Sequence, residues 1–455
     1  MPLPSESKCI FGELALLPDG WASNVRVEIA HGRFASVRRD AARQAGDELA
    51  RALLPGMANV HSHGFQRGMA GLTEYRGPDA DNFWSWRELM YRFVGRMTPE
   101  DLEAITALAY VEMLESGFTR VGEFHYVHHD AQGRAYEDPA ETSARIAAAA
   151  EVTGIALTLL PVFYAHSNFG GQPPSEGQRR FVTGLETFAA LVERCRRLAA
   201  ALPDARVGVA PHSLRACTPE QLQAVSALAG DGPIHIHAAE QLREVEDCVA
   251  WSGTTPVKWL LDHVSVDRRW CLIHATHLTA AETEGLARSG AVAGFCPVTE
   301  ANLGDGIAPA APFLAAGGTF GIGTDSNVSI SVRDELRQLE YSQRLRDRSR
   351  NVLAARSAHS TGRTLFAEAQ RGGSRALGVG EGGALAQGQA ADCFSLTEAH
   401  AIPAPDAALD GFIFAARPGV QDVWRGGRRV VTAGVHHAGP WARERFEKCL
   451  AALLA

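Results

Sequence analysis

Residues 53–63 read LLPGMANVHSH, an apolar run that contains a Pro-Gly pair and ends in two histidines. A short apolar run bounded by turn residues is typical of a strand that is buried on both faces. Strand side chains alternate between faces, so His61 and His63 project to the same side and the serine between them faces away. The segment therefore predicts a buried strand that presents two imidazoles at its carboxyl end.

Seven further apolar runs follow, separated by longer amphipathic segments. They are RVGEFHY (120–126), IALTLLPVFY (155–164), RVGVAPHS (206–213), GPIHIHA (232–238), WCLIHAT (270–276), AVAGFCP (291–297) and TFGIGTD (319–325). Strands that alternate with helices are typical of βα units around a parallel sheet. Helix starts are visible at Thr98-Pro99 and at the capping boxes that begin at Thr218 and Thr279. Eight strands suit a closed barrel, so we predict an α/β protein in which residues 53–377 form a (β/α)8 TIM barrel.

The two ends of the chain have a different pattern. VRVEIAHGRFASVRR (25–39) and DVWRGGRRVVTAG (422–434) are short alternating runs interrupted by glycine, which indicates strands and hairpins. We therefore expect residues 1–52 and 378–455 to build one small β-sandwich domain together, with a helix at the C-terminus.

Composition limits the classes of partner. The chain has 44 Lys and Arg against 52 Asp and Glu, a net charge of -8, so no broad basic surface for nucleic acid is expected. No apolar run approaches the about 18 residues of a transmembrane helix, and the N-terminal segment lacks the pattern of a secretory signal. We therefore expect a cytoplasmic protein that binds neither nucleic acid nor membranes.

Histidines and an aspartate end several of the predicted strands. His235 and His237 repeat the His-x-His spacing on the fifth strand, and Asp325 ends the eighth. Barrel enzymes build their sites at the carboxyl ends of the strands, where these groups would meet. One His-x-His pair is more often only hydrogen-bonded. The combination of His61, His63, His237 and Asp325 favours a Zn²⁺ site, although iron, nickel and cobalt also accept these ligands. His235 lies one layer deeper and is expected to belong to the core.

Two more side chains are candidates for acid–base chemistry beside this site. Glu240 follows His237 by three residues and could shuttle a proton from a metal-activated water. The alternative is an acidic residue that the helix dipole favours in the first turn of a helix. His274 ends the sixth strand and could stabilise developing charge. We expect Glu240, His274 and Asp325 to be the catalytic residues.

Several motifs together resemble the amidohydrolase superfamily, in its single-metal deaminase branch. They are Pro55-Gly56-x-x-x-x-His61-x-His63, His237-x-x-Glu240, His274-x-x-His277-Leu278 and Gly323-Thr324-Asp325. Within this branch, HSHGFQRGMAGLTEYRG (61–77) followed by FWSWRELMYRF (83–93) resembles the formimidoylglutamate deiminases. The resemblance implies hydrolysis of N-formimino-L-glutamate to N-formyl-L-glutamate and ammonia, in histidine degradation, by a zinc-dependent homodimer. The seventh strand departs from the wider branch, because CPVTEAN (296–302) replaces Cys-Pro-x-Ser-Asn.

The resemblance also implies a set of substrate-binding residues. They are Gln66, Arg87, Tyr126, His212 and Arg215. The substrate of this family is a dicarboxylate, and arginine is the side chain suited to bidentate carboxylate recognition, so Arg87 and Arg215 are the first candidates. Two alternatives stay open: a deaminase or hydrolase of a ring substrate, such as guanine or an imidazolone, and a non-catalytic scaffold with this fold.

Overall fold

The central element of the computed structural model is a parallel β-barrel. The structure describes residues 3–76, 81–354, 359–380, 382–397 and 404–455, so Gly77 of the HSHGFQRGMAGLTEYRG motif lies outside the described residues. The barrel strands are β5 (Met57–Ser62), β6 (Phe118–His125), β7 (Ala156–Phe163), β8 (Arg206–Val207), β9 (Ala210–Pro211), β10 (Ile234–Ala238), β11 (Trp270–His274), β12 (Val292–Phe295) and β13 (Thr319–Ile322). Seven of the eight predicted strand segments each overlap one of these strands, and the fourth segment is divided into β8 and β9.

All neighbouring strands of the barrel run parallel. The order is β10-β11-β12-β13-β5-β6-β7-β8, and β9 also pairs with β7. The ring closes between the fourth and fifth segments, where Val209 forms a parallel bridge with Ile234 and Ser213 forms one with His237. The predicted (β/α)8 architecture is thereby confirmed.

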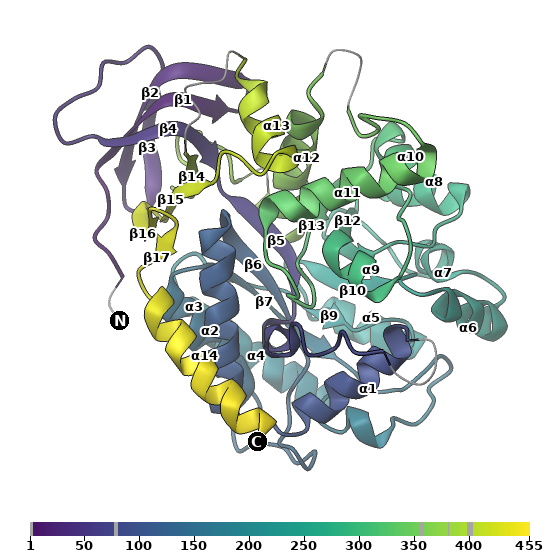
Figure 1. Ribbon diagram of the computed structural model, residues 1–455. Helices are drawn as coiled ribbons and strands as arrows, with labels where there is room; N and C mark the ends of the chain where they lie inside the picture. The colour runs from purple at the N-terminus through teal and green to yellow at the C-terminus, as the bar shows by residue number, and fades with distance from the viewer. Residues whose placement is uncertain (1–2, 77–80, 355–358, 381, 398–403) are drawn as a thin grey trace.

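Helices surround the barrel and occupy most of the intervals between strands (Figure 1). They are α1 (Phe83–Val94), α2 (Pro99–Glu115), α3 (Glu141–Thr153), α4 (Leu185–Ala200), α5 (Pro219–Ala227), α6 (Leu242–Ser252), α7 (Pro256–His263), α8 (Ala280–Ser289), α9 (Pro297–Leu303), α10 (Ala310–Ala315), α11 (Val332–Asp347) and α12 (Thr361–Ala376). Capping boxes start α5 at Thr218 and α8 at Thr279, as the sequence predicts, and α2 starts after the predicted Thr98-Pro99, also with a capping box.

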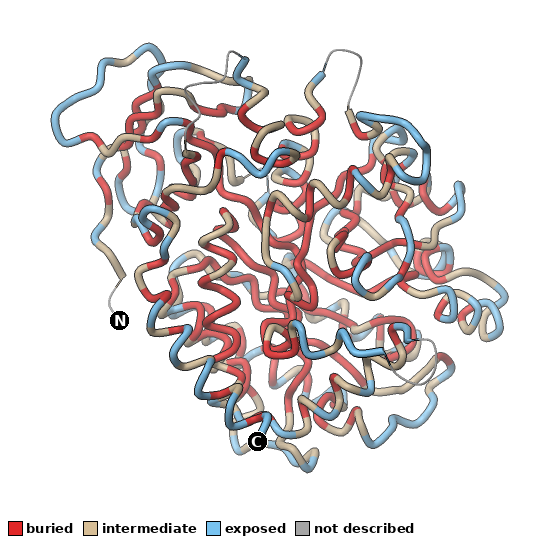
Figure 2. Tube along the Cα trace, in the orientation of Figure 1, coloured by how far each residue is buried: buried red, intermediate tan, exposed pale blue. Residues whose placement is uncertain are grey.

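The end of α12 fills the amino-terminal end of the barrel. Within the barrel, His235 Nε2 lies 2.8 Å from the carbonyl oxygen of Ala376, and Thr158 Oγ1 donates to that of Leu377 at 3.1 Å. Both side chains are buried. His235 is therefore a core residue with a satisfied hydrogen bond, as predicted. Figure 2 shows the same pattern overall, with buried segments along the barrel strands and exposed segments on the outer helices and loops.

A second sheet, at the upper left of Figure 1, combines both ends of the chain. Its strands are β1 (Cys9–Leu17), β2 (Gly20–Ala30), β3 (Arg33–Arg38), β4 (Glu48–Pro55), β14 (Cys393–Leu396), β15 (Val420–Arg425), β16 (Arg428–Thr432) and β17 (Val435–His436). They form one continuous sheet in the order β17-β16-β15-β14-β4-β1-β2-β3. The predicted small β domain from both chain ends is confirmed, and its two halves are parts of one sheet.

This sheet bends around a core of its own. Val27 and Phe34 from one half and Cys393 and Trp424 from the other belong to a single buried cluster. The hairpin turn at Gly32 approaches the turn at Gly426, so the two ends of the sheet come together. Two helices belong to this part of the chain. Helix α13 (Asp406–Phe414) lies between β14 and β15 in the sequence, and the predicted C-terminal helix α14 (Gly439–Leu454) lies along α2 in Figure 1.

The chain passes from the small sheet into the barrel through a single residue. Strand β4 ends at Pro55 and β5 begins at Met57, and a Cβ atom on Gly56 would lie 2.2 Å from Thr119 Oγ1. Only glycine fits that approach. The division of the chain at residues 52/53 and 377/378 stays a prediction. None of the described helices is both long and apolar enough to span a membrane.

Candidate active site

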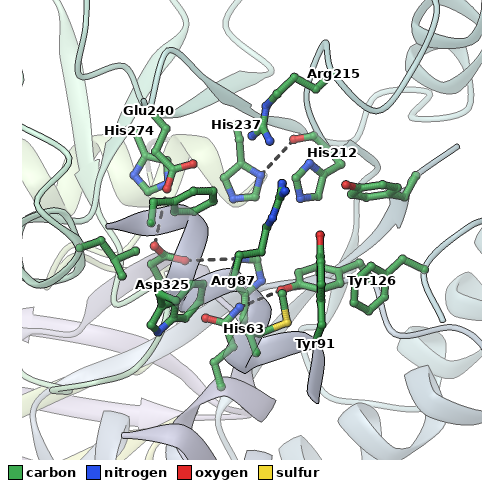
Figure 3. Close-up of a pocket in the computed structure, with 17 residues that line it drawn as sticks. His63, Arg87, Tyr91, Tyr126, His212, Arg215, His237, Glu240, His274 and Asp325 are labelled. Carbon is green, nitrogen blue, oxygen red and sulfur yellow. Dashed lines mark hydrogen bonds and ion pairs between the residues drawn. The ribbon is translucent and has the colours of Figure 1, made fainter. Parts of the chain in front are cut away.

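A pocket opens at the carboxyl ends of the barrel strands, with about 570 Å³ of empty space including its mouth (Figure 3). All of the predicted site residues except His61 line it. His61 is fully buried and contacts His63 and His237 at the base of the pocket. The barrel thus gathers side chains from distant segments of the chain at one end, where such enzymes act.

Four potential metal ligands converge there. His61 Nε2 lies 3.2 Å from His63 Nε2 and 3.1 Å from His237 Nε2. Asp325 Oδ1 lies 3.4 Å from His61 Nε2 and 3.2 Å from His63 Nε2. A tetrahedral ion with ligand bonds of about 2.0–2.1 Å places its ligand atoms about 3.3 Å apart. The spacing of these four side chains therefore suits a divalent transition metal.

The protonation of the imidazoles also suits a metal. Backbone carbonyl oxygens of Phe124 and His212 lie 2.8 and 3.0 Å from the Nδ1 atoms of His63 and His237. A carbonyl only accepts, so Nδ1 carries the hydrogen and Nε2 directs its lone pair into the cluster. Burial lowers the pKa of His61 to about 3, which keeps this ring neutral. Neutral imidazoles are the form that binds metal ions.

A buried amide locks the segments that carry the ligands. Asn327 Nδ2 donates to the carbonyl oxygens of His63 and Asp325, at 3.0 and 3.1 Å, and its Oδ1 accepts from Thr324 Oγ1 at 2.6 Å. Asp325 has a left-handed backbone, with φ 43°. Such a conformation persists where surrounding contacts enforce it. Asn327 therefore holds the end of β5 and the loop after β13 in one arrangement.

Glu240 and His274 lie beside the cluster. His274 Nε2 is 3.7 Å from Glu240 Oε1 and 3.9 Å from Asp325 Oδ2. Burial raises the pKa of Glu240 to about 7, and His274 and Arg215 limit that rise. Burial alone would lower the pKa of His274, but the nearby carboxylates, first Glu240, raise it to about 10. A carboxyl group that titrates near neutral pH suits proton transfer.

Two arginines face the pocket from opposite sides. Arg87 comes from α1 and Arg215 from the loop after β9, and Figure 3 shows both pointing toward the histidine cluster. The Nε atoms of both are buried without a hydrogen-bond partner. A buried cation without hydrogen bonds is unfavourable. The two guanidinium groups are therefore available to the oxygens of an anionic ligand.

Polar groups complete the wall between the arginines and the cluster. Gln66 lies in the short 3-10 helix Gly64–Met69 and donates from Nε2 to the Tyr126 hydroxyl at 2.8 Å, while its Oε1 is buried without a partner. His212 follows β9, and its Nδ1 lies 3.1 Å from Ser213 Oγ. All three predicted residues therefore lie at the pocket.

Several residues that matter for the geometry were missed by sequence reasoning. Tyr91 and Tyr164 line the pocket. Glu300 contacts His274, and Asp305 approaches Glu240. Asn327 had a signal in the sequence, an amide two residues after Asp325. Tyr164 ends the predicted strand 155–164, so strand alternation could have indicated it. Tyr91, Glu300 and Asp305 come from helices and a loop, where no strand periodicity indicates which side chains turn inward.

Two further histidines, His125 and His128 in the segment FHYVHHD (124–130), do not line the pocket. His125 Nε2 lies 3.0 Å from Thr142 Oγ1, and His128 Nε2 lies 2.8 Å from the carbonyl oxygen of Val162. Both rings are buried. Neither ring belongs to the cluster of candidate metal ligands.

Comparison with known proteins identifies the family. Residues 52–430 match the model of the amidohydrolase family, and residues 7–51 match "Formimidoylglutamate deiminase HutF, N-terminal domain". A formimidoylglutamate deiminase from Pseudomonas aeruginosa is 53% identical over 98% of this chain and 99% of its own length.

Solved structures agree in fold. The crystal structure of an amidohydrolase from Brucella melitensis has 56% identity and a TM-score of 0.96, and the match covers 98% of this chain and 100% of that one. An adenosine deaminase from Xanthomonas campestris with bound zinc has 22% identity and a TM-score of 0.82 over the whole of both chains. The chain therefore belongs to the amidohydrolase family, in the branch of the formimidoylglutamate deiminases.

Proposed function

We propose that this protein hydrolyses N-formimino-L-glutamate to N-formyl-L-glutamate and ammonia, as a step of histidine degradation. The observation that carries the proposal is the pair of inward-facing arginines above a cluster of metal-binding type. A dicarboxylate with a formimino group needs cationic partners at one end and a hydrolytic centre at the other. The 53% identical relative is named for this activity.

We propose Zn²⁺ as the resident metal, with His61, His63, His237 and Asp325 as its ligands. The donor set of three imidazoles and one carboxylate is one that zinc binds in catalytic sites. When bound, the ion would lower the pKa of a water molecule and so activate it for attack. Inductively coupled plasma mass spectrometry of the purified protein identifies the metal.

Glu240 and His274 have complementary roles in this proposal. Water attacks the formimino carbon, and Glu240 or Asp325 accepts the proton that the water loses. Glu240 then delivers a proton to the terminal nitrogen of the tetrahedral intermediate. The hydroxyl group of the intermediate loses the second proton of the water, which the same carboxylates transfer to the leaving nitrogen. The carbon–nitrogen bond breaks, ammonia leaves, and the oxygen of the water becomes that of the formyl group. His274, 3.7 Å from Glu240, stabilises the charge that develops.

The substrate is held from the opposite wall. Arg87 and Arg215 bind its carboxylates through charge-assisted hydrogen bonds. Gln66, with a buried and unpartnered Oε1, and Tyr126 bind polar groups of the substrate, as does His212. Guanine carries no carboxylate and imidazolonepropionate carries one, so a pocket with two guanidinium groups favours the dicarboxylate over both ring substrates.

The deciding experiment measures ammonia release from N-formimino-L-glutamate and from guanine and, in parallel, loss of the ring absorbance of imidazolonepropionate, because opening of that ring releases no ammonia. Each assay uses the protein as purified, after chelation, and after chelation followed by added zinc. We expect turnover only of N-formimino-L-glutamate, lost on chelation and restored by zinc. Activity confined to a ring substrate would refute the proposed substrate. No turnover of any substrate with a full metal content would favour a scaffold.

A further inference from the structure

Glu300 is a buried carboxylate that contacts the ring of His274. It lies in α9, directly after the seventh barrel strand, and is 4% exposed. Its Oε1 accepts a hydrogen bond from the backbone N–H of Cys296 at 2.8 Å and lies 3.3 Å from Nδ1 of His274. A carboxylate accepts, so Nδ1 of His274 is the donor in this contact. Glu300 therefore fixes which edge of the imidazole turns away from the pocket.

The other edge of the same ring points to the reacting groups. Nε2 of His274 lies 3.7 Å from Glu240 Oε1 and 3.9 Å from Asp325 Oδ2, and the ring stacks on that of His237 with an interplanar angle of 15°. The backbone of His274 has φ 70°, and the next residue has φ 47°. These left-handed conformations are sparsely populated and need surrounding contacts to hold them. The contact at Nδ1 is one such restraint.

We infer that Glu300 is a positioning residue for the proposed reaction: it binds Nδ1–H of His274 and so holds Nε2 toward Glu240 and the substrate. The inference rests on the proposed function, because His274 matters only if chemistry occurs beside it. A carboxylate that orients a histidine through the ring nitrogen remote from the reaction is a general device of enzymes.

The simplest competing explanation is that Glu300 only supports the start of α9. The chain contains a matched glutamate for that role. Glu335 of α11 is also buried, and its Oε2 accepts from the backbone N–H of Val298, in the first turn of the same helix, at 3.0 Å. Its hydrogen bonds in the described structure involve no residue of the pocket. Glu335→Gln therefore disturbs the same helix and leaves His274 alone.

The test compares Glu300→Ala, Glu300→Gln and Glu335→Gln with the wild type in the metal-loaded protein. Metal content, Tm, kcat and KM are measured for each, with N-formimino-L-glutamate as substrate. Loss of an orienting partner typically reduces activity 10- to 100-fold. We expect Glu300→Ala to lower kcat by about that factor, with KM changed less than about threefold. Glu300→Gln keeps an acceptor oxygen, so its kcat should be at least about fivefold higher than that of Glu300→Ala.

A spectroscopic measurement follows the hydrogen bond itself. In ¹H–¹⁵N NMR of the wild type, the ring N–H of His274 should give a downfield signal, which His274→Asn assigns by its loss. We expect this signal to persist in Glu300→Gln and Glu335→Gln and to vanish in Glu300→Ala. The readout does not depend on turnover, so it separates a failure of this inference from a failure of the proposed function.

Three results would overturn the inference. The first is a kcat of Glu300→Ala within about twofold of the wild type. The second is an equal loss in Glu335→Gln, which would assign the effect to α9 as a whole. The third is a Glu300→Gln variant that folds and binds metal but is no more active than Glu300→Ala. If Glu300→Ala does not fold, the NMR signal and kcat of Glu300→Gln against Glu335→Gln decide the question.

Discussion

Glu240 is the residue on which the proposed proton transfers depend. It is 4% exposed, and its carboxylate lies between His274 and the pocket. Glu240→Gln keeps the shape and removes the titrating group, so turnover should fall by about 10²-fold or more with the metal content unchanged. Steady-state kinetics and metal analysis measure both quantities. Glu246→Gln, on the exposed side of α6, is the control. Near-normal turnover of Glu240→Gln would refute its role.

Asp305 is a buried acid whose protonation makes the stability of the folded protein depend on pH. Its Oδ2 has no hydrogen-bond partner, and burial, followed by repulsion from Glu240, raises its pKa to about 9. An unfolded aspartate has a pKa of about 3.9, so the folded protein binds a proton here that the unfolded chain releases. Its contribution to stability is therefore full below about pH 4 and is lost as the pH rises toward about 9.

Asp305→Asn removes this titration and keeps the shape of the neutral acid. We expect its Tm, relative to that of the wild type, to increase from pH 4 to pH 9. Thermal unfolding of both proteins across this range measures the difference, and Asp231→Asn on the exposed surface is the control. A difference in Tm that does not change with pH would show that Asp305 is ionised in the folded protein.

At the level of single residues, strand patterns predicted the candidate metal ligands, but they did not predict the residues that contact the groups beside those ligands. His61 and His63 are two residues apart at the end of one strand and His237 lies near the end of another, so their common face follows from a period of two. Glu300 and Asp305 lie in and after a seven-residue helix, α9. Which side of so short a helix turns inward depends on the packing of its neighbours.

Helix α1 is the element that brings a cation to the pocket. It begins with a capping box at Asn82 and inserts Arg87 beside the ring of Trp84, whose centroid is 4.5 Å from the guanidinium carbon. Arg243 of α6 approaches the same ring at 4.9 Å. Trp84 therefore joins α1 to the barrel helices through cation–π contacts.

Replacement of the arginines should weaken substrate binding. A hydrogen bond to a charged group contributes about 1.5–3 kcal/mol, which corresponds to a factor of about 10–150. We expect Arg87→Met and Arg215→Met each to raise KM for N-formimino-L-glutamate by a factor in this range, with full metal content. Initial-rate kinetics and metal analysis test this. Arg92→Met, on the exposed face of α1, should leave KM unchanged. An unchanged KM in both pocket variants would contradict the proposed substrate site.

The helix starts show what local sequence determines at the level of elements. The capping boxes at Thr218 and Thr279 use contacts within four residues, so they form wherever the helix forms. Strand β8/β9 shows the opposite case. The predicted segment 206–213 is interrupted as it completes the ring, because closure with β7 and β10 depends on strands far away in sequence.

At the scale of the molecule, a buried ionic network joins the barrel to the small sheet. Arg425 of β15 donates to Asp392 Oδ1 at 3.1 Å and lies 3.6 Å from Asp204 Oδ2, which also pairs with Arg120 of β6. Arg425 is 7% exposed. Removing one partner of a buried pair leaves an uncompensated charge, which typically costs about 3–5 kcal/mol.

Arg425→Met should therefore lower the free energy of unfolding by about 3 kcal/mol, as measured by urea denaturation. Arg429→Met is the matched control, because Arg429 is 41% exposed in its side chain and pairs with Glu48 at 3.6 Å. A surface pair of that kind contributes less than about 1 kcal/mol. Equal losses in the two variants would exclude a special role for the network.

The homodimer and the cytoplasmic location stay predictions.

The sequence by itself determined the eight-strand alternation, the capped helices, the contribution of both chain ends to one β domain, and the convergence of the four candidate ligands. Each of these follows from local periodicity or from the rule that parallel strands present their carboxyl ends together. Only the tertiary structure decided that the β domain is one bent sheet, that Asn327 locks the ligand segments, and that Glu300 and Asp305 approach His274 and Glu240. These features depend on contacts between distant segments, which packing selects and no local pattern encodes.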